Sequence, residues 1–576
     1  MVYHAGAVFV ERIRHSTSTA ADRGIRFYDS PNAFSEITFV ELDADARARA
    51  VEFAAGGLRP GDVAILAFEP GIPFIRALMA CLYAGVVAAP VPVTALRNAD
   101  AVRQRLFAIA RDSGAKVVLT APGALGPLGV ADDEVVEGAS VLLVEGPAAA
   151  DPDLWTMPEI AESSTAILQY TSGSTGRPKG VMVSQGNLLA NQQAINSMIG
   201  MSSSSVFVGW LPHYHDMGLI GQILQPIYAT ASMYMTSPSQ FLRRPLQWLR
   251  MVTQFRATHT VGPDFAFALC TRMITDEQRD ELDLSSLEGA ITGAEPVRIQ
   301  TLDAFTARFA PVGFRGEVFI PAFGMAETTL LVTGHRGDEP PQAIRASAEG
   351  IERDVLVAAA PGERALSLVP CGPAAAGMEI AIVDAATSTG LEEGLIGEIW
   401  VRGASVTQGY WNRPDETLAE FGATIEGDSG RPYLRTGDLG AIVDGELVIT
   451  GRLKDLIIVR GRNIYPQDLE LAAGGLLAAG CLSAAFELPG SATEIGLVAE
   501  IEGAMLASGD VETLGADLRR SISQEFTLPS LGIALIRKGS LPRTTSGKVQ
   551  RALTRKLLVE QQLAVVHANG FEVVHA

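Results

Sequence analysis

The chain has 576 residues, which is too long for one compact core, so we expect several folding units arranged in two or more lobes. Its 47% apolar and 19% charged residues exclude wholesale disorder and are typical of a globular protein with a large interior. The formal net charge of −20 comes from scattered acidic residues without Lys/Arg-rich runs, which argues against nucleic acid as a partner. A solvated acidic surface is the simplest interpretation, and attraction to a basic protein is the alternative.

The first part of the chain, from about residue 36, predicts an α/β fold. Helical runs such as 42–58 alternate with short β-rich runs such as DVAILAF (62–68) and KVVLTA (116–121), each closed by Gly or Pro. This alternation predicts mostly parallel sheets flanked by helices. Residues 77–96 are uncharged for long enough to cross a bilayer, but they are rich in Ala and Gly and include Pro90 and Pro92. We interpret them as a buried helix running into a strand, and we predict no transmembrane segment.

The cysteines and the first residues of the chain indicate the cellular compartment in which we expect the protein. Cys81, Cys270, Cys371 and Cys481 lie far apart without paired spacing, so they suggest neither a zinc site nor a disulfide framework. Charged residues at positions 11, 12 and 14 interrupt the first apolar stretch, which argues against a secretory signal peptide. We therefore predict a cytoplasmic protein.

The pattern changes after Gly397. Short strand-like segments follow one another in GEIWVRG (397–403), YLRTGDLGAIVDGELVITG (433–451) and LKDLIIVRG (453–461), and we expect helical periodicity to return only after Pro466. Two Gly-punctuated β segments meet at 451–454. We therefore expect residues 1–451 to form a large N-terminal domain of mostly parallel sheets plus a β subdomain. Residues 452–576 are expected to form a small, mobile α+β domain that acts as a lid.

The most informative segment is YTSGSTGRPKG (170–180), which combines glycines, hydroxyl side chains and one lysine. Backbone N–H groups, hydroxyls and a cation in one loop can surround anionic phosphates. Pro178 stands where a Walker-type loop would have its second glycine, so this is not a P-loop of that type. The β-like TAILQ (165–169) precedes the segment and the helix-like NLLANQQAINSMI (187–199) follows it, so we expect a strand-loop-helix. A flexible surface loop is the alternative, and the fixed lysine after proline argues against it.

Segment 170–180 resembles the phosphate-binding signature of the adenylate-forming superfamily, which includes acyl-CoA synthetases, luciferases and peptide-synthetase adenylation domains. Further segments resemble motifs of that superfamily in the same order: FGMAETT (323–329), GEIWVRG (397–403), YLRTGDLG (433–440), GRLKDLIIVRGRNIYPQDLE (451–470) and PRTTSGKVQR (542–551). The resemblance spans almost the whole chain. It implies ATP as a substrate, Mg²⁺ as the metal and an acyl adenylate as the product.

The resemblance also implies roles for single residues. Glu327 is expected to hold Mg²⁺, which prefers hard oxygen ligands, and Lys454 to act as the hinge of the small domain. Lys548 is expected to stabilise the charge that develops when a carboxylate oxygen attacks the α-phosphorus. The implied catalytic residues are Lys548, Glu327, Lys179 and His215. The implied nucleotide-binding residues are Thr171, Ser172, Gly173, Ser174, Thr175, Gly176, Lys179, Gly293, Ala294, Glu295, Phe323, Gly324, Met325, Ala326, Thr328, Asp438, Arg452 and Lys548.

Two of these roles have a specific physical basis. The ionised carboxylate of Asp438 can accept two hydrogen bonds from a ribose diol, and the ring of Phe323 can stack on adenine. Taken alone, an Asp in a Gly-flanked turn is common without a ligand, and a single Phe is more often a core residue. Only the order of the motifs favours the functional interpretation.

Several segments resemble the fatty acyl-AMP ligases more closely than the CoA ligases: WLPHYHDMGLIG (210–221), PSQFLRRPLQWLRMV (238–252), VGPDFAFALC (261–270) and GASVTQGYWNRPDET (403–417). Ala326, where many CoA ligases have Thr, points the same way. Gln185, Asp264 and Phe323 depart from these ligases, which often have His, Asn and Tyr there. Asp264 falls near the expected acyl pocket, and because an unpaired carboxylate is costly beside an alkyl chain, we expect it to be solvated or hydrogen-bonded.

Two further segments have open interpretations. His213 and His215 offer too few ligands for a metal site, and the resemblance implies that His215 lines the junction of the acyl and nucleotide pockets. Residues 217, 220, 223 and 224 after it are candidates for an alkyl tunnel or for ordinary core. Residues 337–366 resemble an insertion thought to restrict the domain rotation that thioester formation with CoA needs; a passive surface excursion is the equal alternative.

The sequence therefore predicts a fatty acyl-AMP ligase. ATP and a fatty acid, with Mg²⁺, would give acyl-AMP and pyrophosphate. The acyl group would then pass to the phosphopantetheine thiol of a carrier protein on a separate chain, in polyketide, lipopeptide or complex lipid biosynthesis. A fatty acyl-CoA ligase is the alternative within enzymes. A non-catalytic nucleotide- or lipid-binding module is the alternative outside them, and the joint presence of Lys179, Glu327, Asp438 and Lys548 argues against it.

Overall fold

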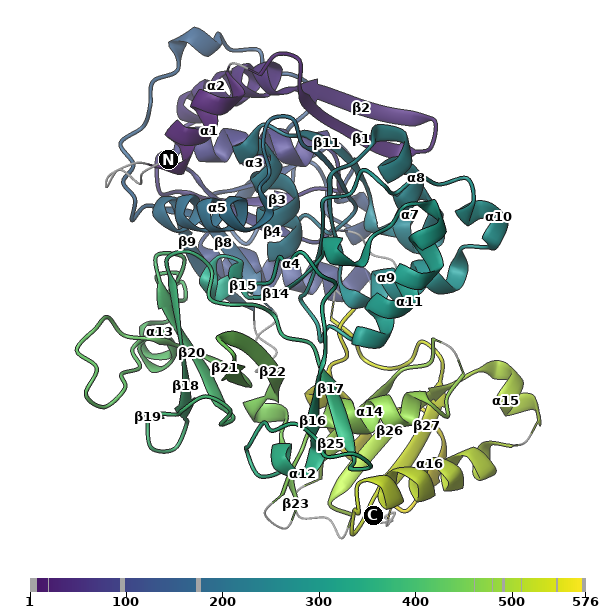
Figure 1. Cartoon of the computed structure of the whole chain (residues 1–576). Helices are drawn as coiled ribbons and strands as arrows, with labels where there is room; N and C mark the ends of the chain where they lie inside the picture. Colours follow the sequence, from purple (N-terminus) through teal and green to yellow (C-terminus); the bar gives the residue numbers. More distant parts are fainter. Residues whose placement is uncertain are drawn as a thin grey trace.

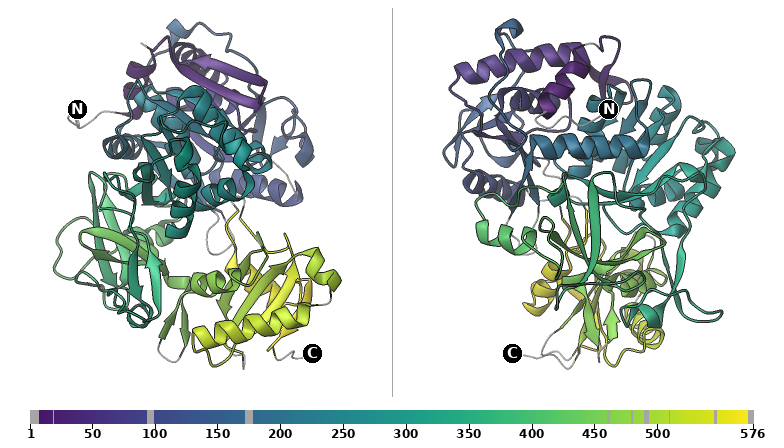
Figure 2. Two further views of the ribbon diagram at one scale, coloured as in Figure 1. Left: turned by 45° about the vertical axis from the view of Figure 1, so that its right-hand side comes forward. Right: turned by 60° about the vertical axis from the view of Figure 1, so that its left-hand side comes forward.

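The computed structural model of the chain describes residues 8–18, 20–93, 99–171, 178–459, 462–478, 480–488, 493–508, 510–544 and 547–571. Figure 1 shows a large part built mainly from the first 330 residues, with a green β-rich part and a yellow-green C-terminal part beneath it. The two further views in Figure 2 show these two smaller parts beneath the large one as well. The predicted α/β class, with parallel sheets, a β subdomain and a small C-terminal domain, is confirmed.

One sheet of the large part has the strand order β15-β14-β13-β12-β10-β11-β1-β2. Its interior pairings, from β1 through β11, β10, β12 and β13 to β14, are parallel, and only the edge strands β2 and β15 run antiparallel to their neighbours. The strands are β1 (Gly24–Ser30), β2 (Ala33–Thr38), β10 (Val206–Gly209), β11 (Ser232–Thr236), β12 (His259–Val261), β13 (Gly289–Thr292), β14 (Phe319–Gly324) and β15 (Leu331–Gly334).

The other sheet of the large part has the order β6-β7-β5-β3-β4-β8-β9 and is parallel from β7 to β8. Every residue of β3, β4 and β5 is buried, as expected for parallel strands covered on both faces. Its strands are β3 (Val63–Ala67), β4 (Val87–Val91), β5 (Val117–Thr120), β6 (Val135–Val136), β7 (Ala139–Leu143), β8 (Thr165–Thr171) and β9 (Lys179–Ser184). Within the uncharged stretch 77–96, residues 77–84 lie in α3 (Ile72–Ala84) and residues 87–91 form β4, so the interpretation as a buried helix followed by a strand is confirmed for the described residues.

Helices cover both sheets, and their apolar faces join the sheets in one large core that extends from Phe9 to Tyr410. The remaining helices of this part are α1 (Phe9–Thr17), α2 (Phe39–Ala55), α4 (Ala99–Ser113), α5 (Gln185–Ile199), α6 (Gln225–Ala229), α7 (Pro238–Arg243), α8 (Leu246–Phe255), α9 (Asp264–Met273), α10 (Asp276–Arg279) and α11 (Ile299–Phe309). Met217–Leu224 forms a π-helix, η3, a rare conformation that is frequent at functional sites.

The β subdomain is an antiparallel sheet with the order β19-β18-β20-β21-β22. Its strands are β18 (Met378–Asp384), β19 (Thr389–Gly390), β20 (Gly397–Gly403), β21 (Leu434–Val443) and β22 (Glu446–Arg452). A helix, α13 (Pro414–Phe421), interrupts this β region, so the expectation that helices return only after Pro466 is wrong. Pro414 at the first helical turn, with Asp415 and Glu416 beside it, is a start signal that explains the helix.

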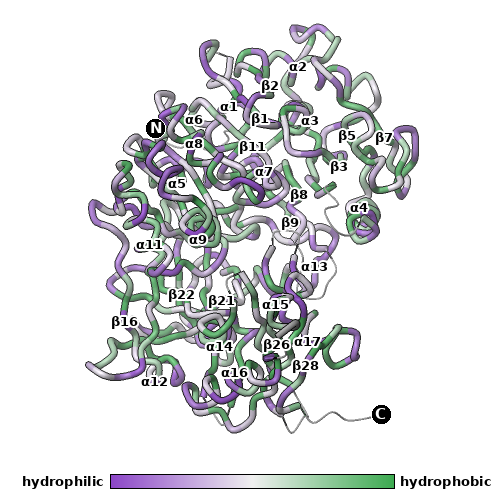
Figure 3. The backbone as a smooth tube through the Cα atoms, turned by 90° about the vertical axis from the view of Figure 1, so that its right-hand side faces the viewer, coloured by the Kyte–Doolittle hydropathy of each residue, from purple (hydrophilic) through white to green (hydrophobic). Residues whose placement is uncertain are grey.

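Residues 337–366 include β16 (Ile344–Ser347) and α12 (Ala348–Ile351), and β16 pairs with β17 (Ala365–Leu368). Figure 1 shows this ribbon beside the C-terminal part. That part contains β23 (Ile457–Val459), β24 (Arg462–Ile464), α14 (Pro466–Gly474), β25 (Ser483–Glu487), β26 (Ile495–Ile501), α15 (Gly503–Ser508), α16 (Val511–Glu525), β27 (Gly532–Arg537), α17 (Arg551–Val559) and β28 (Val565–Asn569). It has its own buried core around β26 and β27, and Figure 3 draws much of β26 in green.

The phosphate-loop candidate differs from its expected setting. Strand β9 begins within this segment, at Lys179, and pairs antiparallel with β8, from Thr171 opposite Lys179 to Thr165 opposite Ser184. Helix α5 starts only at Gln185, where Ser184 and Asn187 form a capping box. The predicted strand over 165–169 and the predicted helix over 187–199 are confirmed by β8 and α5. The expectation that the helix follows the loop directly is wrong, because KGVMVS (179–184) forms a strand that extends the sheet before the helix begins.

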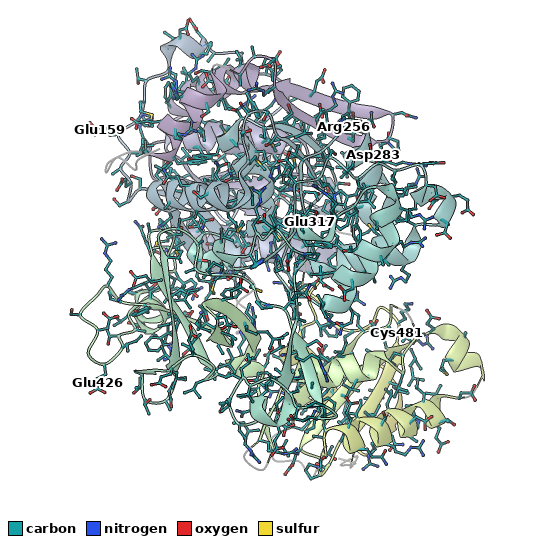
Figure 4. All side chains as sticks on the ribbon, in the orientation of Figure 1. Glu159, Arg256, Asp283, Glu317, Glu426 and Cys481 are labelled. Atoms are coloured by element: carbon teal, nitrogen blue, oxygen red, sulfur yellow. The ribbon has the colours of Figure 1, made fainter. Side chains whose placement is uncertain are left out.

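The surface charges agree with a solvated acidic exterior. Glu159 and Glu426, labelled in Figure 4, are exposed at the rim of the molecule. Arg256 and Asp283, also labelled there, form an exposed ion pair of 3.6 Å, a kind of contact that contributes little to stability. Among the described residues, none of the helices combines the length and the apolar character needed to span a bilayer.

Candidate active site between the two domains

The carboxyl ends of β10, β12, β13 and β14 lie at the same edge of their sheet because these strands are parallel. In open α/β sheets, ligands bind at this edge. The segments that follow the strands there are 210–216, 262–264, 293–295 and 325–328. These segments contain eight of the 18 site residues that the sequence predicted in the large domain: His215, Gly293, Ala294, Glu295, Met325, Ala326, Glu327 and Thr328.

The lysine of the phosphate-loop candidate is held by acidic residues. Lys179 is buried at the start of β9, and its Nζ lies 2.7 Å from Glu416 Oε2 and 3.3 Å from Glu420 Oε1. The ammonium also lies 4.6 Å from the ring centre of Tyr410. Burial works against the charge, but the carboxylates outweigh it and raise the pKa of Lys179. Thr171 ends β8 directly opposite Lys179.

The other predicted residues of this loop, Ser172, Gly173, Ser174, Thr175 and Gly176, lie outside the described residues.

Glu327 lies in a short turn, η6 (Ala326–Thr328), that follows β14. The hydroxyl of Tyr410 lies 3.0 Å from Glu327 Oε1 and 2.6 Å from Glu420 Oε2. Burial raises the pKa of the Glu327 carboxyl. A contact chain of ion pair and hydrogen bonds thus runs from Lys179 through Glu420 and Tyr410 to Glu327.

The Glu327 carboxylate suits a hard cation such as Mg²⁺, which proteins often bind through one or two carboxylates while substrate phosphates supply other oxygens. Asp216 and Glu420 are close enough to raise the pKa of Glu327 electrostatically. In the part of the chain that the structure describes, no cluster of three or more His, Cys, Asp or Glu side chains forms a metal site. A single carboxylate such as that of Glu327 fits a metal whose other ligands come from a nucleotide and water.

The turns after β13 and β14 bring backbone close to backbone. A Cβ at Gly324 would lie 1.9 Å from the carbonyl oxygen of Leu330, so only glycine fits there. Gly293 is under a similar restriction, since its Cβ would lie 2.5 Å from the carbonyl oxygen of Ala322. Ala294 has a φ of +63°, which is unusual for a residue other than glycine and typical of functional turns.

The remaining predicted residues of these turns have their own partners. Glu295 accepts a hydrogen bond of 2.7 Å from the backbone N–H of Phe265. The hydroxyl of Thr328 donates to the carbonyl oxygen of Met325 at 2.9 Å, and Ala326 is buried. Phe323 is buried among apolar residues of β15 and the β subdomain. The ring of Phe323 therefore also contributes to this hydrophobic core.

Asp438 and Arg452 lie opposite each other on β21 and β22, at the end of the β subdomain. Arg452 Nε donates to Asp438 Oδ1 over 2.9 Å. Burial raises the pKa of Asp438, although Arg452, Lys548 and Lys454 act in the other direction. Burial, followed by the charge of Arg452, lowers the pKa of Lys454 in the adjoining turn η7 (Leu453–Asp455).

Lys548 connects the two domains electrostatically. Its side chain is exposed at the surface, but the nearby protein atoms remove part of its hydration. This burial lowers the pKa of Lys548 below the ordinary range. The carboxylates of Asp216, Glu295 and Asp438 oppose this shift, so all three lie within electrostatic reach of the ammonium. Two of these carboxylates, Glu295 and Asp438, belong to residues that the sequence predicted for the site, whereas Asp216 does not.

The two histidines have different surroundings. His213 is buried with its ring centre 4.1 Å from that of Phe74, and burial lowers its pKa to about 3, so it is a neutral core residue. His215 Nδ1 lies 2.6 Å from Asp216 Oδ1. Burial raises the pKa of Asp216, but His215 and Lys548 outweigh burial and leave the pKa below its usual range. The π-helix η3 begins directly after this pair, and its residues 217, 220, 223 and 224 are buried in the main core.

Two departures from the family pattern have structural explanations. Asp264 is buried at the start of α9 and accepts from Arg298 N at 2.9 Å and from Thr301 Oγ1 at 2.8 Å. It caps the start of α11, so the expectation that Asp264 is hydrogen-bonded is confirmed. Gln185 is buried and accepts a hydrogen bond of 3.3 Å from Val10 N.

Residues 337–366, the predicted insertion, contact the C-terminal domain. Glu352, next to α12, pairs with Arg364 and lies 3.2 Å from Arg462 of β24. Asp354 Oδ1 accepts from Asn463 Nδ2 at 2.7 Å. The guanidinium of Arg364 lies 4.9 Å from the ring centre of Phe526. A small cavity between the two parts, lined also by Asp468, completes this junction.

Sequence reasoning did not single out Tyr410, Glu416, Glu420 and Asp216. The first two belong to the segment 403–417 and the last to 210–221, both quoted only for their resemblance. The signal that could have found Glu416 and Glu420 is their i, i+4 spacing after Pro414, which places both carboxylates on the same face of a helix.

Comparisons with known proteins show the family of the chain. Residues 15–411 match the family of AMP-binding enzymes. The chain is 39% identical over 539 residues to the medium-chain-fatty-acid–[acyl-carrier-protein] ligase JamA of Moorena producens, covering 92% of this chain and 91% of that protein. A fatty acyl-adenylate ligase structure from a study of the Escherichia coli and Legionella pneumophila enzymes is 31% identical, with a TM-score of 0.86 over 96% of this chain and 98% of that one.

The fatty acyl-adenylate ligase of Legionella pneumophila, solved in complex with acyl adenylate and pyrophosphate, is 34% identical to this chain. Its TM-score is 0.75, over 98% of both chains. The family implies ATP as a substrate. The chain belongs to the AMP-binding, adenylate-forming enzymes and, within them, to the family of fatty acyl-AMP and acyl-carrier-protein ligases.

Proposed function

We propose that this enzyme activates a fatty acid with ATP to acyl-AMP and passes the acyl group to the phosphopantetheine thiol of a carrier protein on another chain. The observations that carry the proposal are the contact chain from Lys179 through Glu420 and Tyr410 to Glu327 and, beside it, the electrostatic influence of Asp216, Glu295 and Asp438 on Lys548, which links the last motif to the other motifs. This is the arrangement that adenylation requires of a mobile domain that carries a catalytic lysine. We further propose that residues 1–451 and 452–576 are the two domains and that Lys454 is the hinge.

In the first step, a carboxylate oxygen of the fatty acid attacks the α-phosphorus of ATP. The new oxygen–phosphorus bond replaces the bond to the bridging oxygen of pyrophosphate, which leaves with its electron pair. Both reactants are anions, so positioned cations are the main requirement. Lys548 and His215 act where charge develops at the α-phosphate and carboxylate, and Lys179 receives the β- and γ-phosphates. Asp438 accepts hydrogen bonds from the ribose hydroxyls, and Phe323 packs against the adenine.

Glu327 is proposed to hold Mg²⁺, which would neutralise phosphate charge and orient the leaving pyrophosphate. Tyr410 would position Glu327, because its hydroxyl contacts the carboxylates of both Glu327 and Glu420. Glu420 and Glu416 neutralise Lys179 until the phosphates replace them.

In the second step, the carrier thiol attacks the acyl carbonyl and AMP leaves with the bridging oxygen. The contacts of Glu352 and Asp354 with the C-terminal domain support a carrier thiol over CoA as acceptor. They favour the domain orientation in which Lys548 faces the site and oppose the rotation that thioester formation with CoA would need. These contacts also argue against the insertion being a passive excursion.

The test is ATP–pyrophosphate exchange with fatty acids of increasing chain length, followed by thioester assays with CoA and with phosphopantetheinylated carrier proteins. We expect exchange with at least one fatty acid, and thioester on a carrier in preference to CoA. Absence of exchange with every acid would refute the first step. Rapid formation of acyl-CoA would refute the second and favour a fatty acyl-CoA ligase.

A further inference from the structure

Lys548 lies on a narrow hairpin of the C-terminal domain. Arg543 and Val549 form a β-bridge, and Thr544 N donates to the carbonyl oxygen of Lys548 at 2.8 Å. The Thr544 hydroxyl accepts from Lys548 N at 3.0 Å. Gly547 has a φ of +91°, a left-handed conformation that glycine adopts readily, and its N–H donates to the carbonyl oxygen of Thr544 at 2.9 Å. The backbone of Lys548 is therefore defined, but a hairpin this small needs anchors at its base.

The incoming strand of the hairpin is anchored by Glu500, a carboxylate of β26 with no solvent exposure. It accepts hydrogen bonds from Gly539 N at 2.8 Å, from Leu541 N at 3.1 Å and from Arg543 Nη2 at 3.2 Å. A buried carboxylate with several donors is well satisfied, and such bonds are stronger than neutral ones. This side of the hairpin is thus fixed to the sheet.

The outgoing side is anchored by Arg551, the first residue of α17. Its Nε and Nη2 donate to the two oxygens of Glu470 at 2.7 and 2.8 Å, which is a bidentate pair. Its Nη1 donates to Asp455 Oδ2 at 2.8 Å. Each of these side chains is at most 22% exposed, so solvent screens the contacts only in part. The two carboxylates overcome the effect of burial and raise the pKa of Arg551, so its charge is permanent.

Asp455 connects this cluster of side chains to the predicted hinge. Asp455 follows the predicted hinge residue Lys454 directly and lies in the same turn, η7. Glu470 lies on α14, the first helix after the hinge. The hinge turn, that helix and the end of the catalytic hairpin are therefore joined by one guanidinium, three residues beyond Lys548 in the chain.

We propose that Arg551 is a positioning residue that ties the Lys548 hairpin to the hinge turn, so that the lysine follows hinge rotation as part of one rigid body. The inference rests on the proposed function, since it assumes that Lys548 acts in adenylation. Arginine is specifically needed here, because only its planar fork can bond Glu470 in a bidentate manner and Asp455 at the same time. Lysine would keep the charge and lose that geometry.

The experiment compares Arg551→Lys with the matched control Arg555→Lys, an exposed arginine one turn along the same helix. In ATP–pyrophosphate exchange, Arg551→Lys is expected to lower kcat about 10- to 100-fold, because small displacements of a catalytic group have effects of this order. The KM values for ATP and the fatty acid should stay within about 2-fold, since Arg551 touches neither substrate. The control should match the wild type in all three parameters.

Hydrogen exchange gives a second readout that does not depend on activity. In Arg551→Lys, the amides of residues 539–551 should exchange about 10-fold faster than in the wild type, while those of β26 stay unchanged. Faster exchange throughout the C-terminal domain would show a general structural role and overturn the proposal. Unchanged exchange of 539–551, or an unchanged kcat, would also overturn it. If the wild type shows no ATP–pyrophosphate exchange with any of the fatty acids, the proposed function fails. The hydrogen-exchange measurement would still test whether Arg551 anchors the hairpin.

Discussion

Glu352 offers the sharpest test of the proposal that residues 337–366 restrain the domain rotation needed for thioester formation with CoA. Substitution Glu352→Gln keeps the size of the side chain but removes the charge that faces Arg462 at 3.2 Å. Asn463 N would still donate to the backbone carbonyl of Glu352 at 3.1 Å, so the insertion should remain in place. The change therefore weakens one contact between the insertion and the C-terminal domain without removing the junction.

The magnitude follows from the exposure of the pair. The side chains of Glu352 and Arg462 are 10% and 31% exposed, which places the pair between the surface and buried classes. Surface pairs contribute up to about 1 kcal/mol, and breaking a buried pair costs about 3–5 kcal/mol. After discounting for solvent at Arg462, we expect a loss of about 1.5–2 kcal/mol, which is a change of about 10- to 30-fold in the equilibrium between domain orientations.

The assay is the ratio of acyl-CoA formation to ATP–pyrophosphate exchange. We expect this ratio to rise about 10- to 30-fold in Glu352→Gln, because the domain orientation that excludes CoA loses the same factor. Glu349→Gln is the matched control, since Glu349 lies on α12 in an exposed pair with Arg353. The control ratio should change by less than about 2-fold. An unchanged ratio in Glu352→Gln would refute the idea that this contact restrains the rotation.

Three further predictions concern single side chains. Burial raises the pKa of Asp468 to about 7, so the folded state holds a proton that the unfolded state releases, and the stability of the wild type falls as the pH rises from about 4 to 7. Asp468→Asn should therefore raise the melting temperature more at pH 8 than at pH 5. An equal rise at both pH values would contradict this. Glu420→Gln should lower the KM for ATP about 2- to 5-fold, since the phosphates compete with one carboxylate fewer for Lys179, and a higher KM would show that Glu420 supports the nucleotide. Asp264→Ala should destabilise the fold by about 1–2 kcal/mol through the lost cap of α11, measured by denaturant unfolding, while a changed KM for the fatty acid would show that Asp264 faces the pocket.

The parallel core and the order of the motifs could be predicted from the sequence because their signals are local. The buried strands read as uninterrupted apolar runs, and 77–96 could be separated from a membrane span by its prolines. The hairpin around the phosphate-loop candidate was missed because the short segment 179–184 has no turn residue between it and α5 to mark a strand. Helix α13 was missed because its eight residues carry too few apolar positions to show helical periodicity, and none of them is buried.

The residues of the candidate site could be predicted only where a single motif contained them. Glu327, Asp438 and Lys548 each stand in a recognisable segment. The chain from Lys179 through Glu420 and Tyr410 to Glu327 joins segments more than 80 residues apart, and no local pattern carries such a pairing. The same holds for Arg551, whose partners Glu470 and Asp455 lie 81 and 96 residues earlier in the chain.

Attack of the fatty acid's carboxylate on the α-phosphorus of ATP is tested most directly with an isotope. The enzyme is given ATP, Mg²⁺ and a fatty acid labelled with ¹⁸O in its carboxyl group, and hydroxylamine releases the acyl group from its adenylate. The account predicts AMP that contains one ¹⁸O atom per acyl group released, and no such AMP from Lys548→Ala. Unlabelled AMP, or ADP with the label in inorganic phosphate, would contradict it.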